Sequence, residues 1–115
     1  MNFHGVKIAV VINEKLLLHL RDNKPGLFNA NMWDFPGGGR EGDETVEECA
    51  ARELQEEFSL RLDDGNVTFV KDFPAQKDPN QRAIFMVVEF PARSEKEIVL
   101  GEGQGWRLFS FDEFF

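Results

Sequence analysis

Residues 52–57, with the sequence RELQEE, carry three carboxylates at spacings that could bind a cation. In a helix, Glu53, Glu56 and Glu57 occupy positions i, i+3 and i+4 and therefore share one face. At about 100° per residue, the apolar residues upstream point to the same side. These residues are Val46, Cys49, Ala50 and Leu54. The pattern predicts that three negative charges continue a stripe that should face the core.

Carboxylates that face a protein interior are costly to bury as bare charges. A hard divalent cation offsets that cost, and Mg²⁺ prefers oxygen ligands while it keeps water and substrate phosphates in its shell. The opposite interpretation is a solvated acidic helix face, because glutamate is a good helix former. The spacing alone favours the solvated face, so the surrounding sequence has to decide between the two.

The flanking residues predict the elements that position this segment. Thr45 and Glu48 have the spacing of a capping box, so we expect a helix from near Thr45 to about Phe58. Apolar alternation predicts strands elsewhere, and Gly, Pro and Asn clusters predict loops between them. The expected strands are 6–12, 15–21, 66–71, 82–90 and 106–109, with a short extended piece at 33–35. The expected turns and loops are 13–14, 22–31, the glycines 37–39 with a polar turn to 43, 72–81, 93–96 and 101–105.

One helix among several strands predicts an α+β fold with a mixed sheet. The sequence contains no repeat, low-complexity tract or domain boundary, so residues 1–115 are expected to form a single domain. Asp112 is a candidate cap for a last short helix near the end of the sequence.

Composition excludes several classes of protein. Hydrophobic residues make up 42% of the chain, including 12 Phe, which is enough for a core and argues against disorder. The net charge of −8 disfavours long nucleic acids, whereas a small phosphorylated ligand could bind through a bridging cation. No apolar run approaches the ~20 residues of a membrane span. A single cysteine excludes an internal disulfide framework, so a reducing cytoplasm is expected. Cys49 itself lies on the apolar stripe and is interpreted as a packing residue.

The context of the acidic segment resembles a known motif. Starting from Gly38, five residues lead to Glu44, and seven more lead to REL-Q-EE at 52–57, followed by Phe58, Ser59 and Leu60. This arrangement resembles the box GX5EX7REUXEEXGU of the MutT/Nudix hydrolase family, in which U is a bulky aliphatic residue. The box would span 38–60, and only Ser59 departs from it, where the family has glycine. A helix that ends on serine pays about 1 kcal/mol for the left-handed conformation, so the exit from the helix could follow a different path.

The resemblance implies a Nudix fold, in which a mixed sheet is sandwiched with helices and the box forms a loop–helix–loop. It implies Mg²⁺-dependent hydrolysis of a nucleoside diphosphate linked to another group, with Mn²⁺ as a substitute. By this match Glu53, Glu56 and Glu57 are metal ligands, and the Gly37 carbonyl is a candidate further ligand. Catalytic roles are expected for Glu53 and Glu56.

Two further roles follow from the same match. Arg52 would orient a carboxylate through a bidentate pair, although an exposed helix arginine is the plain alternative. Glu44 would support the site or simply lie at the surface.

The segments WDFPGGG and GEGQGW resemble the branch of the family that cleaves nucleoside triphosphates such as 8-oxo-dGTP. In that branch Phe35 would lie near the base and Arg21 would reach the substrate, whereas a core phenylalanine and a solvated strand end are the alternatives. Glu102, in the second segment, would bind a second ion or accept a proton, against the alternative of an exposed loop residue.

Two functions from different classes remain open. One is an enzyme that hydrolyses a nucleoside triphosphate, with a nucleotide-sugar or ADP-ribose hydrolase as its rival. The other is a domain that senses nucleotides without cleaving them. A sensing domain would be expected to lose glutamates of the box, and this sequence keeps all of them. The family often adds a C-terminal helix that touches the base, so either the enzyme is minimal or a segment lies outside this sequence. The oligomeric state is not indicated.

Overall fold

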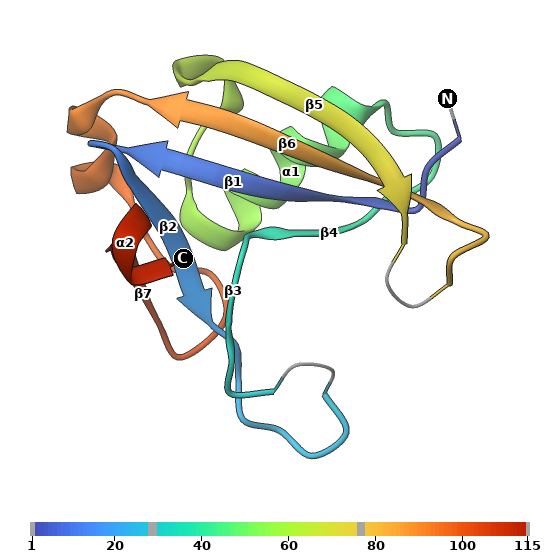
Figure 1. Cartoon of the computed structure of the whole chain (residues 1–115), viewed down its shortest axis with the longest axis horizontal. Coiled ribbons are helices and arrows are strands. Elements are labelled where there is room, and N and C mark those ends of the chain that lie inside the picture. The colour runs from blue at the N-terminus through green and yellow to red at the C-terminus, as the bar shows by residue number, and fades with distance from the viewer. Residues whose placement is uncertain (1, 28–29, 76–77, 115) are drawn as a thin grey trace.

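The computed structural model describes residues 2–27, 30–75 and 78–114, and it confirms the predicted α+β class. Within those residues one seven-stranded mixed sheet carries one long helix on one of its faces (Figure 1). The strands are β1 (Gly5–Ile12), β2 (Lys15–Leu20), β3 (Trp33–Asp34), β4 (Gly37–Gly39), β5 (Asn66–Pro74), β6 (Arg82–Phe90) and β7 (Gly105–Ser110). The helices are α1 (Val46–Phe58) and α2 (Phe111–Phe114), with the 3₁₀ turns η1 (Leu62–Asp64) and η2 (Ala92–Glu97).

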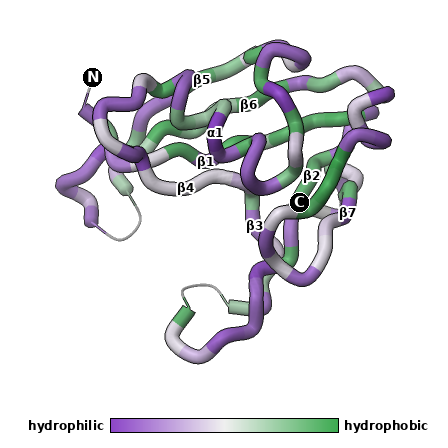
Figure 2. Tube along the Cα trace, turned by 180° about the vertical axis from the view of Figure 1, so that it is seen from behind, coloured by the Kyte–Doolittle hydropathy of each residue, from purple (hydrophilic) through white to green (hydrophobic). Residues whose placement is uncertain are grey.

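The middle of the sheet is a parallel pair. β1 and β6 pair in parallel from Gly5↔Ala83 to Ile12↔Phe90, whereas the other strand pairs are antiparallel. The strand order is β3-β2-β1-β6-β5, with β4 paired to β1 and β7 paired to β2. Hydrophobic residues predominate along β1 and β6, and the β4 glycines are near neutral on the hydropathy scale (Figure 2).

β1 and β2 form a tight hairpin at the predicted turn. Asn13 and Glu14 both have positive φ angles, of 54° and 60°. Two successive residues of this kind form the turn whose twist matches that of paired strands. The hairpin fixes the register of β2 and thereby sets which of its side chains face α1.

α1 has both of the predicted ends. The Thr45 side chain accepts a hydrogen bond from the Glu48 N–H and the Glu48 side chain accepts one from the Thr45 N–H, which is a complete capping box. Ser59 adopts the left-handed conformation at φ 58° and its N–H bonds back to the carbonyls of Leu54 and Gln55. The helix therefore leaves as a glycine would direct it, and the altered path considered from Ser59 is not observed.

Three expected boundaries were wrong. Residues 37–39, assigned to no strand, form β4 against Gly5–Lys7 of β1. β5 continues to Pro74, and the extension is joined to β6 by an ion pair between Asp72 and Arg82, N to O 2.9 Å. Residues 93–96 lie in the 3₁₀ turn η2 rather than in an irregular connector.

The last helix is capped differently from the prediction. The Ser110 hydroxyl accepts from the Glu113 N–H, and the Glu113 carboxylate accepts from the Ser110 N–H. Asp112 lies inside α2 and is exposed, so it does not serve as the cap.

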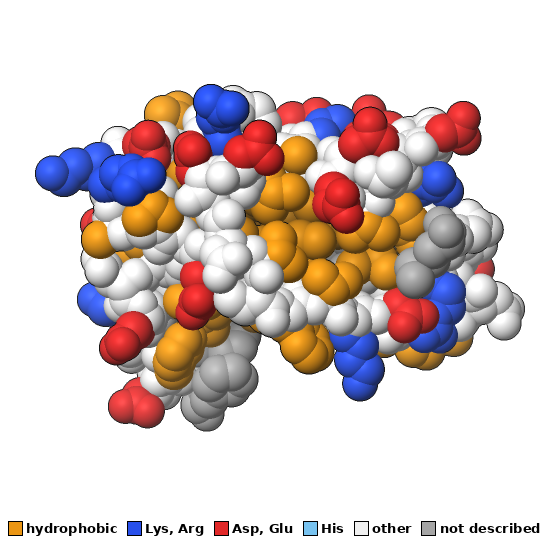
Figure 3. Space-filling model, turned by 90° about the horizontal axis from the view of Figure 1, so that it is seen from above, with side chains coloured by type: hydrophobic (Ala, Val, Ile, Leu, Met, Phe, Trp, Pro, Cys, Tyr) orange, Lys and Arg blue, Asp and Glu red, His pale blue; other side chains and the backbone are white. Residues whose placement is uncertain are grey.

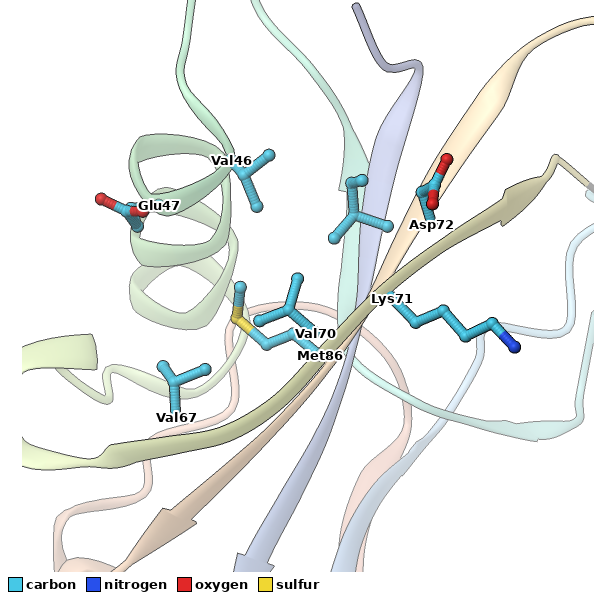
Figure 4. Close-up of a pocket in the computed structure, with 8 residues that line it drawn as sticks. Val46, Glu47, Val67, Val70, Lys71, Asp72 and Met86 are labelled. Atoms are coloured by element: carbon cyan, nitrogen blue, oxygen red, sulfur yellow. The ribbon is translucent and has the colours of Figure 1, made fainter. Parts of the chain in front are cut away.

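An apolar groove lies between the start of α1 and the edge of the sheet. It has a volume of about 620 Å³ and is lined by Val46, Glu47, Val67, Val70, Lys71, Asp72, Ile84 and Met86. Figure 3 looks onto this side of the molecule, where hydrophobic side chains form a continuous area. The close-up in Figure 4 shows Val46 directed from α1 toward β5 and β6, whereas Glu47 and Lys71 point away. No helix among the described residues is long and apolar enough to cross a membrane.

Candidate active site

Glu53 is the most deeply placed carboxylate of α1. Its residue is only 8% exposed, and it lies against the backbone of β4. A Cβ atom built on Gly38 would come within 2.5 Å of Glu53 Oε1, so the absence of a side chain at Gly38 makes room for this carboxylate. Burial raises the pKa of Glu53, although the neighbouring Arg52 opposes the shift. The carboxylate is therefore poorly solvated.

Glu57 is held by the same glycine strand. The Gly37 N–H donates to Glu57 Oε2 over 2.7 Å. Burial raises the pKa of Glu57 to about 8; the Gly37 hydrogen bond works against this rise and the charge of Glu53 adds to it. Gly37 has a φ of 149°, and a Cβ there would lie 2.2 Å from the Val6 carbonyl oxygen, so a larger residue could not bring this N–H to Glu57.

Glu56 does not point inward as predicted. Its side chain is 57% exposed and accepts a hydrogen bond from Arg52 Nη1 at 3.3 Å. Across the part of the chain that the structure describes, no three acidic, histidine or cysteine side chains converge as a ready-made metal cluster. Two of the three predicted ligands, Glu53 and Glu57, thus face the interior, and Glu56 lies at its rim.

Arg52 connects the parts of this site. It forms a bidentate pair with Glu44, with Nε to Oε2 at 2.7 Å and Nη2 to Oε1 at 3.0 Å. It also donates to Glu53 Oε1 over 2.9 Å and to the Gly39 carbonyl over 2.7 Å. The hydrogen bonds that Arg52 donates to Glu44 lower the pKa of the Glu44 carboxyl to about 2. The same hydrogen bonds raise the pKa of Arg52.

These contacts show how Arg52 and Glu44 are paired. The predicted bidentate pair exists, but its partner is Glu44 rather than a predicted metal ligand. Glu44 is half-buried against Arg52, and its supporting role in the site stays a prediction.

The two predicted substrate residues lie together beside Asp34. Arg21 Nη1 is 3.8 Å from Asp34 Oδ2, and the Phe35 N–H donates to Asp34 Oδ1 over 2.8 Å. Phe35 packs edge-on against Phe85 with ring centroids 5.9 Å apart and is half-buried. Lys7 closes the group with an ion pair to Asp34 at 2.7 Å. Neither Lys7 nor Asp34 was singled out from the sequence.

Glu102 is exposed in a loop that is anchored on both sides. The Gly101 N–H donates to the Glu57 carbonyl over 2.8 Å, and the Gln104 N–H donates to the Leu20 carbonyl over 2.8 Å. A Cβ on Gly101 would lie 1.8 Å from the Glu56 carbonyl oxygen, so the loop runs directly over the last turn of α1. The fold thus brings the Glu102 segment next to the end of the acidic helix.

His19 is the residue of this region that sequence reasoning missed. It is 5% exposed on β2, and its Nε2 lies 3.7 Å from Glu57 Oε1. Burial lowers the pKa of His19. The available signal was a polar residue between Leu17 and Arg21 on one face of a predicted strand.

Cys49 behaves as predicted from its place on the apolar stripe. It is a free, buried cysteine. Burial raises the pKa of its thiol to about 11, which suits a packing residue.

The NUDIX domain family matches residues 2–115. The chain belongs to this family. The predicted resemblance is therefore confirmed at the level of the family, and the chain is a Nudix hydrolase. Nudix hydrolases generally use divalent metal ions.

Solved structures of Nudix proteins share the fold. An Ap4A hydrolase from C. elegans, in a binary complex, superposes with a TM-score of 0.75 at 14% identity, over 96% of this chain and 82% of that one. A MutT protein from Methanosarcina mazei Go1 gives 0.70 at 23% identity, over 96% and 79%. A bifunctional NMN adenylyltransferase/ADP ribose pyrophosphatase from Francisella tularensis, complexed with AMP and Mn ion, gives 0.61 at 26%, over 96% of this chain and 34% of that one.

The residues of the Nudix box suit a hard divalent cation. Glu53 and Glu57 are desolvated oxygen donors, and burial raises the pKa of each, although the charge of Arg52 opposes the rise at Glu53 and that of Lys7 opposes it at Glu57. Glu56, at the exposed rim, is the carboxylate with the most freedom to reorient. All of these donors are oxygens, the ligand type that Mg²⁺ and Mn²⁺ accept.

Proposed function

We propose that this chain is a pyrophosphohydrolase that cleaves a nucleoside triphosphate, oxidised or otherwise modified, to a nucleoside monophosphate and pyrophosphate. The observation that carries the proposal is the pair of desolvated carboxylates, Glu53 and Glu57, fixed against the backbone of Gly37 and Gly38. Such a pair is costly unless protons or a cation neutralise it. A phosphate-bearing substrate that arrives with a divalent cation supplies that charge.

Mg²⁺, with Mn²⁺ as a substitute, would be held by Glu53, Glu56 and Glu57, with Glu102 and the Gly37 carbonyl as further candidates. When bound, the cation would neutralise the diphosphate and make a water molecule more acidic. The reaction forms a bond from the water oxygen to phosphorus and breaks the bond from phosphorus to the bridging oxygen, which leaves with pyrophosphate or the monophosphate.

The side chains around the cation have separate tasks in this proposal. The proton of the attacking water passes to a carboxylate, and Glu102 is the candidate because its loop lies beside the last turn of α1. Arg52 keeps Glu53 in place through its hydrogen bond of 2.9 Å. Glu44 fixes Arg52 in turn, through the bidentate pair.

Arg21 and Phe35 are proposed to contact the nucleoside. Arg21 directly follows β2 and Phe35 directly follows β3, and both contact Asp34. The ring of Phe35 is held by Phe85 and offers an apolar edge, whereas Arg21 offers a charge. Together they suit a flat base with polar substituents.

A hydrolase of ADP-ribose or a nucleotide sugar is the second candidate. It is favoured by the likeness, at 26% identity, to a bifunctional protein whose name includes ADP ribose pyrophosphatase. A sensing domain without catalysis is less well supported, because every glutamate of the box is present. We further propose that residues 1–115 act as one Nudix domain, with the box at 38–60, in the cytoplasm.

The deciding experiment is a substrate panel with Mg²⁺ and, separately, Mn²⁺. The panel contains 8-oxo-dGTP, dGTP, ADP-ribose, a nucleotide sugar and Ap4A, and the products are separated and identified. Release of pyrophosphate from a triphosphate, at a kcat/KM at least tenfold above that for ADP-ribose, supports the proposal. A preference for ADP-ribose or the sugar, with release of a sugar phosphate, replaces it with the second candidate.

A further inference from the structure

His19 lies where three parts of the proposed site meet. Its ring packs edge-on against Phe58 with centroids 6.0 Å apart, inside the last turn of α1. Its Nε2 is 3.7 Å from Glu57 Oε1, and the ring also has a hydrogen bond with the backbone of Phe35, just before the glycine strand. On the other side, a Cβ built on Gly103 would lie 3.5 Å from His19 Nδ1.

The two ring nitrogens have different surroundings, which indicates where the proton lies. Nδ1 is buried and has no hydrogen-bond partner among the described residues. The acceptors around the ring, a carboxylate oxygen and a backbone carbonyl, lie on the side of Nε2. A neutral imidazole carries one N–H, and that N–H is satisfied only on Nε2. The Nε2 edge of the ring therefore lies beside Glu57, while the hydrogen bond of the ring is made with the Phe35 backbone.

Each oxygen of the Glu57 carboxylate therefore has a different neighbour. One oxygen, Oε2, accepts from the Gly37 N–H at 2.7 Å, and the other, Oε1, faces the Nε2–H of His19. The 3.7 Å approach is longer than a hydrogen bond, so the ring acts by its dipole and by filling the space behind the carboxylate. Loss of the ring would leave Oε1 without its neighbour, so that the Gly37 N–H alone would orient the carboxylate.

We propose that His19 is a positioning residue that keeps the Glu57 carboxylate turned toward the cation of the proposed site. The inference rests on the proposed function, because it assigns Glu57 as a ligand. Groups that orient a metal-binding carboxylate typically contribute 10–100-fold to metal affinity. His19 touches neither the cation nor the substrate and works only through Glu57.

The test measures binding of Mn²⁺ alone, without nucleotide, by electron paramagnetic resonance titration. His19→Leu removes the donor and keeps an apolar side chain in the strand. The glutamine in His19→Gln places its amide nitrogen about as far from the backbone as Nε2. The shorter asparagine in His19→Asn places its amide nitrogen only as far out as Nδ1. His4→Gln is the matched control, since His4 is the chain's other histidine and is exposed. Melting temperatures establish that each variant is folded.

We expect His19→Leu and His19→Asn to weaken Mn²⁺ binding by about tenfold or more, and His19→Gln and His4→Gln to stay within about threefold of the parent. Unchanged affinity in the folded Leu variant overturns the inference. If the Leu variant does not fold, equal affinities of the Asn and Gln variants overturn it. Glu53→Gln is titrated in parallel: if that variant also binds Mn²⁺ normally, the proposed metal site itself is wrong, whereas a loss there with none in His19→Leu refutes only the role of His19.

Discussion

The two ends of α1 face two different kinds of surface. Near its C-terminal end the helix contributes Glu53 and Glu57 to a site whose charges are buried and interlocked with Arg52 and the glycine strand. Near its N-terminal end Val46 contributes to the apolar groove, whose charged residues are exposed at the rim (Figure 4). The groove is an open hollow with an apolar lining, whereas the poorly solvated charges lie at the other end of the helix.

This difference teaches where chemistry should be sought in the fold. A groove of about 620 Å³ could hold a ligand, but its lining offers mostly methyl groups. The carboxylate site offers Glu53 and Glu57, whose charged forms are disfavoured by burial. Groups held in costly environments are better indicators of function than volume is. The following experiments test this contrast, beginning with the largest expected effect.

Neutralising the helix carboxylates should have the largest effect. Glu53→Gln or Glu56→Gln is expected to lower turnover by at least ~10²-fold, because each removes charge that holds the cation. Stability should change little, since an amide relieves repulsion in the metal-free site. The matched control is Glu47→Gln, an exposed glutamate of the same helix at the groove. Near-normal turnover of both site variants at saturating Mg²⁺ would contradict the assignment.

Glu102→Gln should follow, with turnover lower by roughly 10–10³-fold and a smaller change in nucleotide affinity. Combined with Glu53→Gln it should lose less than the product of the two single losses, because groups that serve one reacting unit are not additive. Glu97→Gln, exposed in η2, is the control. Full activity of Glu102→Gln from pH 6 to 9 would return the residue to the status of an exposed loop side chain.

The buried charge of Glu57 should make the metal-free protein less stable as pH rises. The pKa of Glu57 is about 8 in the folded chain against an ordinary 4.5, so the folded state holds a proton that the unfolded state releases. The stability that this proton contributes is fully present below about pH 4.5 and is lost as pH rises through 8, by roughly 5 kcal/mol in all. Melting temperatures in EDTA from pH 5 to 8.5 measure this loss.

Glu57→Gln is expected to flatten that pH profile, and Mg²⁺ should raise the melting temperature of the parent more at pH 8 than at pH 6. A non-hydrolysable nucleotide should enlarge the shift. A parent profile that falls no more steeply than that of Glu57→Gln would be inconsistent with a desolvated Glu57.

The groove should give the smallest effect. Val70→Thr conserves shape at a position that is 52% exposed, so stability should change by less than about 1 kcal/mol. Turnover should remain within about twofold. A large loss of turnover in this variant would mean that the groove takes part in the reaction and that the contrast between the two ends of α1 is mistaken.

Sequence reasoning succeeded where the determinants are local. The capping box, the end of α1 and the turn at Asn13-Glu14 depend on neighbours within a few residues, and all three are confirmed. The orientation of Glu56 was missed because the stripe was treated as a broad face. At about 100° per residue, Glu53 and Glu57 fall inside the arc from Cys49 to Leu54, whereas Glu56 falls just outside it.

The remaining errors involve partners that are far away along the chain. Glycines have low strand propensity, and β4 forms because β1 pairs with it. The residue types at 37–39 therefore do not predict a strand. The same holds for the end of β5, where Pro74 is tolerated because the strand lies at an edge. His19 became visible as a site residue only once β2 was packed against the last turn of α1.

The parallel pairing of β1 with β6 has a consequence for how the chain acquires its shape. The first strand ends at Ile12 and its partner begins only at Arg82, so the pair closes a long loop that contains most of the molecule. The β1–β2 hairpin and α1 can form early from local contacts, whereas the parallel pair must wait until the chain has been synthesised through Phe90. Until then the apolar β1 has one unpaired edge. Because this pair joins residues so far apart in sequence, the chain should fold more slowly than one built from local contacts alone.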